Sequence, residues 1–143
     1  MPRLSVWLLR AAMLHLGAGF TFGALILAHK GVPFAAGVWG LLDVHVEFLI
    51  VGWLIQLAIG VGFWALPRFP GEQRYGRIRL GWLGFVLLNG GVVLTAVAHW
   101  IDSTLLGFAG RMLSLGAVLA FAVLIWPRVK PLGGAVAGRH VVH

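Results

Sequence analysis

The sequence predicts an all-α integral membrane protein in which four hydrophobic helices cross a bilayer as a bundle. Sixty per cent of the 143 residues are hydrophobic and only 10% are charged, with a mean hydropathy of +0.96. A water-soluble domain keeps far more charge at its surface. The apolar residues also gather in four segments of the length that a hydrocarbon core of about 30 Å requires at 1.5 Å per residue. We therefore expect lipid to surround most of this chain.

Each apolar segment is expected to form one transmembrane helix. The four helices are expected at 5–28, 44–66, 80–101 and 105–126. The first is too long for a cleaved signal peptide and has no small-residue cleavage site behind it, so we expect a retained helix. Pro33 is a candidate start for an interfacial helix that leads into the second. Residues 1–143 are expected to form one transmembrane domain that ends in a mobile, glycine-rich tail, 131–143.

The net charge of +7 indicates membrane topology and does not imply binding to nucleic acid. Nine of the eleven basic residues flank the helices in three regions that an even number of crossings places on one side. The positive-inside rule then predicts a multi-pass protein of the cytoplasmic (inner) membrane with both termini in the cytoplasm. Only Lys30 and Arg111 lie toward the outside. The nine are Arg3, Arg10, Arg68, Arg74, Arg77, Arg79, Arg128, Lys130 and Arg139.

Histidines are the main candidate ligands for a cofactor. The chain contains no cysteine, which excludes disulfides, thiolate metal sites, iron–sulfur clusters and covalently attached heme. Polar groups inside a bilayer are costly, so each one is a candidate for function. Four histidines lie within the predicted helices or at their outer ends: His15, His29, His45 and His99.

His45 and His99 are expected at similar depth on neighbouring antiparallel helices, because the second helix runs inward and the third outward. Two imidazoles on opposite faces of a porphyrin, together with apolar walls, would bind heme b non-covalently. His99 is therefore the preferred second ligand. His29 shares the outer level, whereas His15 would suit only a more deeply set site.

Glycines and one arginine complete the predicted heme pocket. Twenty-one glycines indicate close helix contacts in lipid, either through plain packing or around a flat cofactor. Gly52, on the His45 face, would leave room for the porphyrin. Arg111, near the outer end of the fourth helix, either holds the heme propionates or pairs with Asp102 or Glu47.

The segment that begins at His45 and ends at Pro67, HVEFLIVGWLIQLAIGVGFWALP, resembles helix II of subunit I in the heme-copper oxidases and nitric oxide reductases. In those families a histidine opens the helix, an aromatic-Leu-Pro ends it, and the histidine is an axial ligand of the low-spin heme. The chain also resembles the small four-helix proteins grouped with that subunit. The resemblance covers about a sixth of the chain and carries over to His45 alone.

The departures from this family limit the function that the resemblance implies. Those enzymes have about twelve helices. They also have a second metal site with three histidines and a further helix that carries His-x-His. This chain has His45-Val46-Glu47 at the related spacing and no such second site. The resemblance therefore implies electron transfer, or redox chemistry with oxygen or nitric oxide, without the copper site. Whether the chain is an oxidoreductase and which redox partner it uses stay open.

The resemblance also implies a homo-oligomer, with a trimer as the first expectation, because subunit I arranges its helices in three arcs of four. Two other classes compete with the heme protein. One is a zinc site built from outer-end side chains: His29, His45, His99, Asp43, Glu47 and Asp102. The other is a cofactor-free assembly or interaction subunit of a respiratory complex.

Overall fold

A computed structural model describes residues 1–69 and 75–129 of the chain, and this part contains helices and no strands. Four helical spans are long and apolar enough to cross a membrane: Arg3–Gly31, Val38–Ala65, Ile78–Trp100 and Thr104–Arg128. The predicted all-α architecture with four such helices is thereby confirmed, and it indicates a multi-pass membrane protein. The predicted mobile tail, 131–143, lies outside the described residues.

The first, third and fourth spans follow the predicted helices closely. They are α1 (Arg3–Gly31), α4 (Ile78–Trp100), and α5 (Thr104–Ile125) with a short 3-10 turn, η3 (Trp126–Arg128). The tight turn between α4 and α5 places Asp102 at a φ of 51°. Ser103 then begins α5, where its hydroxyl accepts a hydrogen bond from the backbone N–H of Leu106.

The second span begins earlier than the sequence predicted. It runs through η1 (Val38–Gly40), α2 (Leu41–Glu47), η2 (Phe48–Ile55) and α3 (Gln56–Ala65). The Asp43 side chain, one residue before the predicted start, is 83% exposed, and the chain is already helical there. Pro33 lies in the loop that precedes η1, so it does not start an interfacial helix.

The middle of the second span is π-helical, from Phe48 to Ile55. A π-helical turn is wider than an α-helical turn and occurs frequently at functional sites. Gly52 lies inside it, opposite α1, and a Cβ atom added there would lie 2.7 Å from Cγ of His15. The π-helical turn therefore lies where His15 of α1 packs against the second span.

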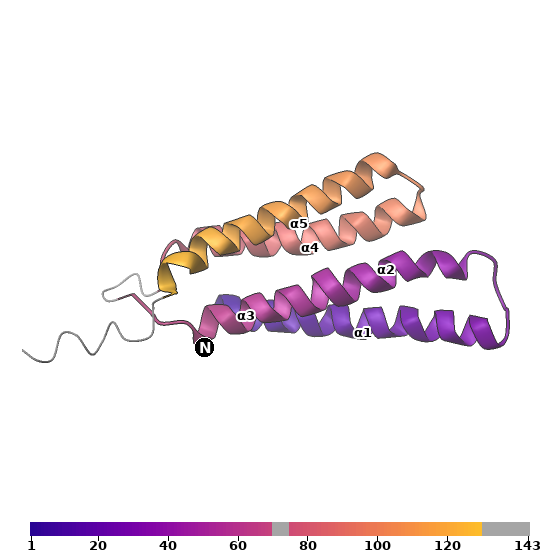
Figure 1. Ribbon diagram of the computed structural model, residues 1–143, viewed down its shortest axis with the longest axis horizontal. Helices are drawn as coiled ribbons and strands as arrows, with labels where there is room; N and C mark the ends of the chain where they lie inside the picture. Colours follow the sequence, from indigo (N-terminus) through magenta and orange to yellow (C-terminus); the bar gives the residue numbers. More distant parts are fainter. Residues whose placement is uncertain (70–74, 130–143) are drawn as a thin grey trace, which may run out of the picture.

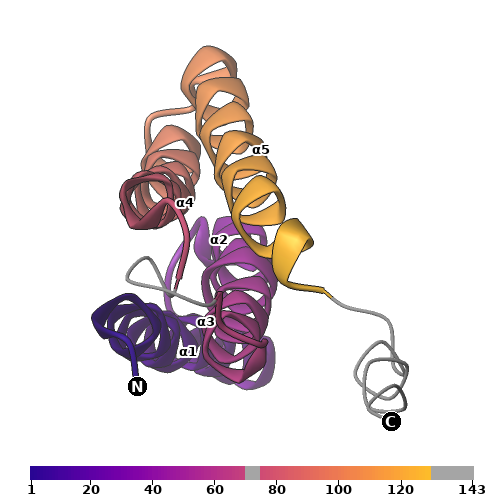
Figure 2. The same cartoon turned by 90° about the vertical axis from the view of Figure 1, so that its left-hand side faces the viewer.

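The helices form two antiparallel hairpins, one of α1 with the second span and one of α4 with α5 (Figure 1). Within the second hairpin, small residues bring the backbones together, since a Cβ atom added at Gly110 would lie 2.9 Å from the carbonyl oxygen of Gly91. Figure 2, viewed from the end that holds the N-terminus, shows α1 and α3 on one side and α4 and α5 on the other. Gly91 and Gly110 thus serve the packing of α4 against α5.

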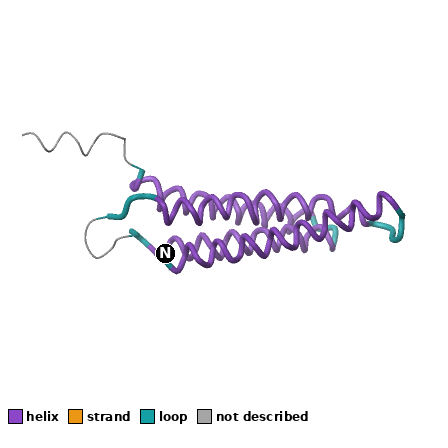
Figure 3. The backbone as a smooth tube through the Cα atoms, turned by 90° about the horizontal axis from the view of Figure 1, so that it is seen from below, coloured by secondary structure: helices purple, strands orange, loops and turns teal. Residues whose placement is uncertain are grey.

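The two hairpins contact each other along the bundle, with α4 against α2 and η2, and they also meet at the end that holds the N-terminus (Figures 1 and 3). A buried cluster of Leu4, Leu8, Phe63, Phe121 and Leu124 joins them there. We call this the basic end, because the described arginines of the three cytoplasm-predicted regions gather there: Arg3, Arg10, Arg68, Arg77, Arg79 and Arg128. We call the opposite end the acidic end, because it holds Asp43, Glu47 and Asp102.

Candidate functional site

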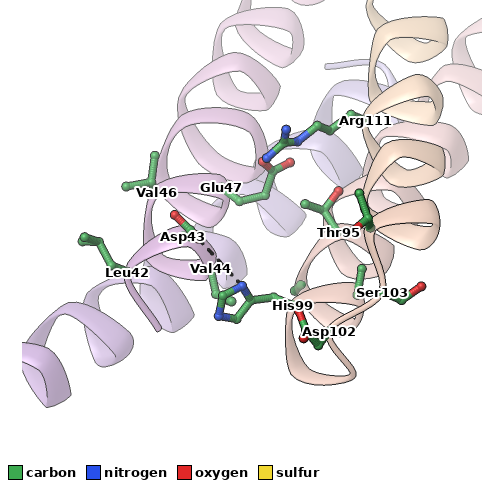
Figure 4. A pocket seen from close by; sticks show the side chains of 14 residues that line it. Leu42, Asp43, Val44, Val46, Glu47, Thr95, His99, Asp102, Ser103 and Arg111 are labelled. Atoms are coloured by element: carbon green, nitrogen blue, oxygen red, sulfur yellow. Dashed lines mark ion pairs between the residues drawn. The ribbon is translucent and has the colours of Figure 1, made fainter. Parts of the chain in front are cut away.

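A cavity of about 430 Å³ opens between the two hairpins at the acidic end (Figure 4). Residues of α2, α4 and α5 line it. Its walls combine apolar side chains with an unusual number of polar groups for a segment able to cross a membrane. The polar lining residues on which the argument depends are Asp43, Glu47, Thr95, His99, Asp102 and Arg111.

Arg111 extends from α5 toward the Glu47 carboxylate, whereas Asp102 lies at the other end of the cavity (Figure 4). Glu47 Oε1 is buried and has no hydrogen-bond partner among the described residues. Opposite charges in such surroundings stabilise each other. Of the two acidic partners expected for Arg111, Glu47 is therefore the nearer in this arrangement.

His99 lies at the mouth of the same cavity, between α4 and α2. Its Nδ1 atom is 3.8 Å from Oδ2 of Asp43, and a Cβ atom added at Gly40 would lie 2.9 Å from its Nε2 atom. The imidazole is 35% exposed. His99 can thus reach a ligand in the cavity after a small rotation, with Asp43 beside it to orient the ring.

His45 lies on the other side of the second span, against α1. Its Nδ1 atom is 2.7 Å from the carbonyl oxygen of Gly19, the distance of a hydrogen bond that Nδ1–H donates. The ring fits against Gly23, where an added Cβ atom would lie 2.7 Å from Cε1. Nε2 has no hydrogen-bond partner among the described residues. We call Gly19 and Gly23 the glycine seat of His45.

His15 and His29 occupy two further positions. His15 is 8% exposed, deep between α1 and the second span, and its ring meets Phe48 edge-on at 5.1 Å between centroids. Gly52 therefore makes room for this imidazole. His29 lies in the last turn of α1, where its Nδ1 accepts a hydrogen bond of 3.2 Å from the backbone N–H of Phe34. His29 thus fixes the loop that follows α1.

The structure does not bring His45 and His99 face to face. Their depths agree with the prediction, because His99 contacts Gly40, close along the helix to His45. Their directions differ, because each residue turns an α-helix by about 100°. Glu47 faces the cavity, and His45, two residues earlier, is rotated by roughly 200° from it toward α1.

The predicted zinc ligands also divide into separate groups. In residues 1–69 and 75–129, no three His, Asp or Glu side chains are close enough to hold one metal ion. His99 and Asp43 are the nearest such pair, at 3.8 Å. His29 and His45 lie elsewhere, as described above.

Two polar contacts between the hairpins were missed by the sequence reasoning. In the middle of the bundle, buried Gln56 donates a hydrogen bond of 3.3 Å from Nε2 to Oδ1 of Asn89. At the basic end, Arg128 is only 1% exposed and donates hydrogen bonds to three carbonyl oxygens at the end of α3. The sequence signal for the first of these contacts was a single polar amide, Gln56 or Asn89, in each of two apolar helices.

The fold and these polar groups define a multi-pass helical membrane protein with an ionisable cavity between two hairpins. Comparison with protein-family models, with curated proteins and with solved structures finds no match to this chain. The resemblance to helix II of the oxidases therefore stays a prediction. Function has to be argued from the residues of the site.

Proposed function

We propose that this chain is a heme b-binding membrane cytochrome, related to subunit I of the heme-copper oxidases, that carries electrons or reacts with oxygen or nitric oxide. The observation that supports this most directly is the environment of His45. A histidine that ligates a metal commonly donates its other ring N–H to a carbonyl oxygen, which fixes the tautomer and the orientation of the ring. His45 donates from Nδ1 to Gly19 and leaves Nε2 available.

The cavity at the acidic end fits the remaining requirements of a porphyrin. His99 offers a second imidazole, apolar side chains line the walls, and Arg111 offers a cation for the propionates. Within one chain, however, His45 and His99 lie on opposite sides of the second span. A heme ligated by both would therefore be shared between two copies of the chain.

Each of the site residues would then have one task in binding the heme. His45 and His99 would hold the iron, the Gly19 carbonyl and the Asp43 carboxylate would orient their rings, and Arg111 would bind a propionate. Glu47 compensates the charge of Arg111 when no propionate is bound. When bound, the heme would supply the one-electron redox chemistry, which these side chains lack.

The visible spectrum of the purified protein tests this proposal. We expect a Soret band and a pigment that acid acetone extracts, because the chain has no cysteine to attach heme covalently. A colourless protein that yields zinc by elemental analysis would support the zinc alternative. A protein with neither would support the cofactor-free assembly subunit.

We propose further that the basic end is cytoplasmic and that the protein lies in the inner membrane. The arginines support this orientation. They lie at the same end of the bundle as the N-terminus, the residues after α3 and the end of α5 (Figure 1). A reporter that is active only in the periplasm should be inactive when fused after His143. Activity of that fusion would reverse the orientation, while a fusion within the loop 102–103 serves as the positive control.

We propose that the chain forms a homo-oligomer, with a trimer as the first expectation. A shared heme requires more than one copy, and two glycines leave open space on the outside of the bundle. Gly17 of α1 and Gly90 of α4 are exposed, and an added Cβ atom at either meets nothing within 4 Å. Such positions allow helices of a second copy to approach closely.

The mass of the heme-loaded protein, with bound detergent subtracted, tests this assembly. We expect a multiple of 15.4 kDa, and we expect Gly17→Leu with Gly90→Leu to shift the mass toward one chain and to lower the heme content together. Leu14→Ile, at an exposed position of the same helix, is the control. Heme bound at full occupancy to a single chain would exclude the shared site.

A further inference from the structure

Among the residues that the structure describes, the basic end holds several arginines and no aspartate or glutamate. Three of the four acidic residues, Asp43, Glu47 and Asp102, lie at the acidic end, and Glu72 lies outside the described residues. Arg77 and Arg79 stand at the start of α4, and both are exposed. Their position at the first residues of an apolar span is that of a membrane interface. The positive charge at the start of α4 therefore favours a negatively charged ligand.

Two hollows flank these arginines. The first, of about 640 Å³, is lined by Arg77, Arg79, Ile78 and Leu83 among others. The second, of about 340 Å³, continues between α4 and α5 and is lined by Val123, Leu124 and Pro127 on the α5 side. Both hollows share the same three residues, namely Gly76, Arg77 and Leu80.

The shared residues connect the two hollows around one guanidinium. Gly76 has a φ of 72°, a conformation that glycine adopts freely, and the backbone N–H of Ile78 donates a hydrogen bond of 2.8 Å to its carbonyl oxygen. This tight turn puts Arg77 directly before α4. Each hollow therefore combines the cationic side chain of Arg77 with an apolar floor, formed in the first hollow by the first turns of α4 and in the second also by the end of α5.

We propose that the two hollows together bind one anionic phospholipid with two acyl chains. The phosphate group contacts Arg77 and Arg79, one acyl chain lies along Ile78 and Leu83, and the other lies along Leu124 and Val123. Basic pockets between transmembrane helices on the cytoplasmic side bind such head groups. A free anion would satisfy the arginines but leave both apolar floors uncovered. The inference is independent of heme binding.

Native mass spectrometry of the full chain in a neutral detergent, titrated with phosphatidylglycerol, tests this site. We expect retention of one phosphatidylglycerol molecule per chain and much weaker retention of phosphatidylcholine with the same acyl chains. Replacing both arginines, Arg77→Gln with Arg79→Gln, should weaken the apparent affinity about 30-fold, or ~2 kcal/mol at ~1 kcal/mol per basic residue near the membrane surface.

The matched control removes the same charge elsewhere at the basic end. Arg3→Gln with Arg10→Gln changes two exposed arginines of α1 that line neither hollow. We expect at most a threefold loss from it. Equal losses in the two double variants would overturn the site and leave only general attraction to the positive end. Displacement of the lipid by millimolar inorganic phosphate, or equal binding of phosphatidylcholine, would overturn it as well.

Discussion

Replacing His45 by alanine is expected to remove nearly all bound heme b and the Soret band, while the protein still assembles into the membrane. The variant deletes the imidazole whose Nδ1 atom lies 2.7 Å from the Gly19 carbonyl oxygen and whose Nε2 atom we assign to the iron. Absorbance and extracted heme per chain measure the loss. His29→Ala is the matched control, because its imidazole fixes only the loop after α1.

A change at the glycine seat separates ligation from general damage. An alanine at Gly23 would place its Cβ atom 2.7 Å from Cε1 of His45, so the ring has to move. Changes to the groups that orient a metal ligand commonly cost about 10–100-fold in affinity, and we expect a loss of that order for heme in Gly23→Ala. Gly31→Ala, with nothing within 4 Å of the added Cβ atom, should bind normally. A wild-type spectrum in His45→Ala would refute the proposed ligand.

Much of the fold follows from the sequence, because hydrophobic length is sufficient to locate helices that cross a membrane. Three spans appear within a few residues of their predicted bounds. The second span begins at Val38, six residues before the predicted start, since a helix can extend past a charged residue such as Asp43, whose side chain is 83% exposed. The π-helical turns from Phe48 to Ile55 leave no mark in the hydropathy pattern, because that segment is as apolar as the rest of the span.

The candidate site was predictable in depth but not in direction. Counting residues from the helix ends places His45 and His99 at one level, and the structure agrees. Which helix face each residue occupies depends on how the hairpins pack, and hydropathy carries little information when lipid surrounds most of a helix. The grouping of Glu47, Arg111 and His99 in one cavity therefore appears only in three dimensions.

Arg128 was predicted only as a charge that sets topology, yet its side chain joins the two hairpins. Nε donates to the carbonyl oxygen of Pro67 at 2.9 Å, and Nη2 donates to those of Phe63 and Leu66 at 2.9 and 2.8 Å. The last carbonyl groups of a helix lack partners within it, so a planar guanidinium suits them well. The guanidinium carbon also lies 4.8 Å from the centroid of the Phe63 ring.

Replacing Arg128 by methionine is therefore expected to destabilise the folded protein by about 3 kcal/mol, since hydrogen bonds from charged donors to buried acceptors contribute ~1.5–3 kcal/mol each and do not add fully. Methionine keeps the aliphatic bulk but leaves the carbonyl groups of Phe63 and Leu66 without a donor. Lysine keeps the charge without the fork geometry, so Arg128→Lys should lose about half as much.

Reversible unfolding of the protein in mixed micelles, followed by the fluorescence of its seven tryptophans, measures these losses. The control is Arg10→Met, because Arg10 is exposed at the same end and its only described contact of this kind is with the Trp7 ring, at 6.0 Å. We expect that variant to lie within about 0.5 kcal/mol of the wild type. Arg128→Met should also reduce the cooperativity of unfolding, because it removes one of the contacts that join the two hairpins. Equal stability of the Arg128→Met and Arg10→Met variants would show that the hydrogen bonds of Arg128 add nothing to the stability of the folded protein.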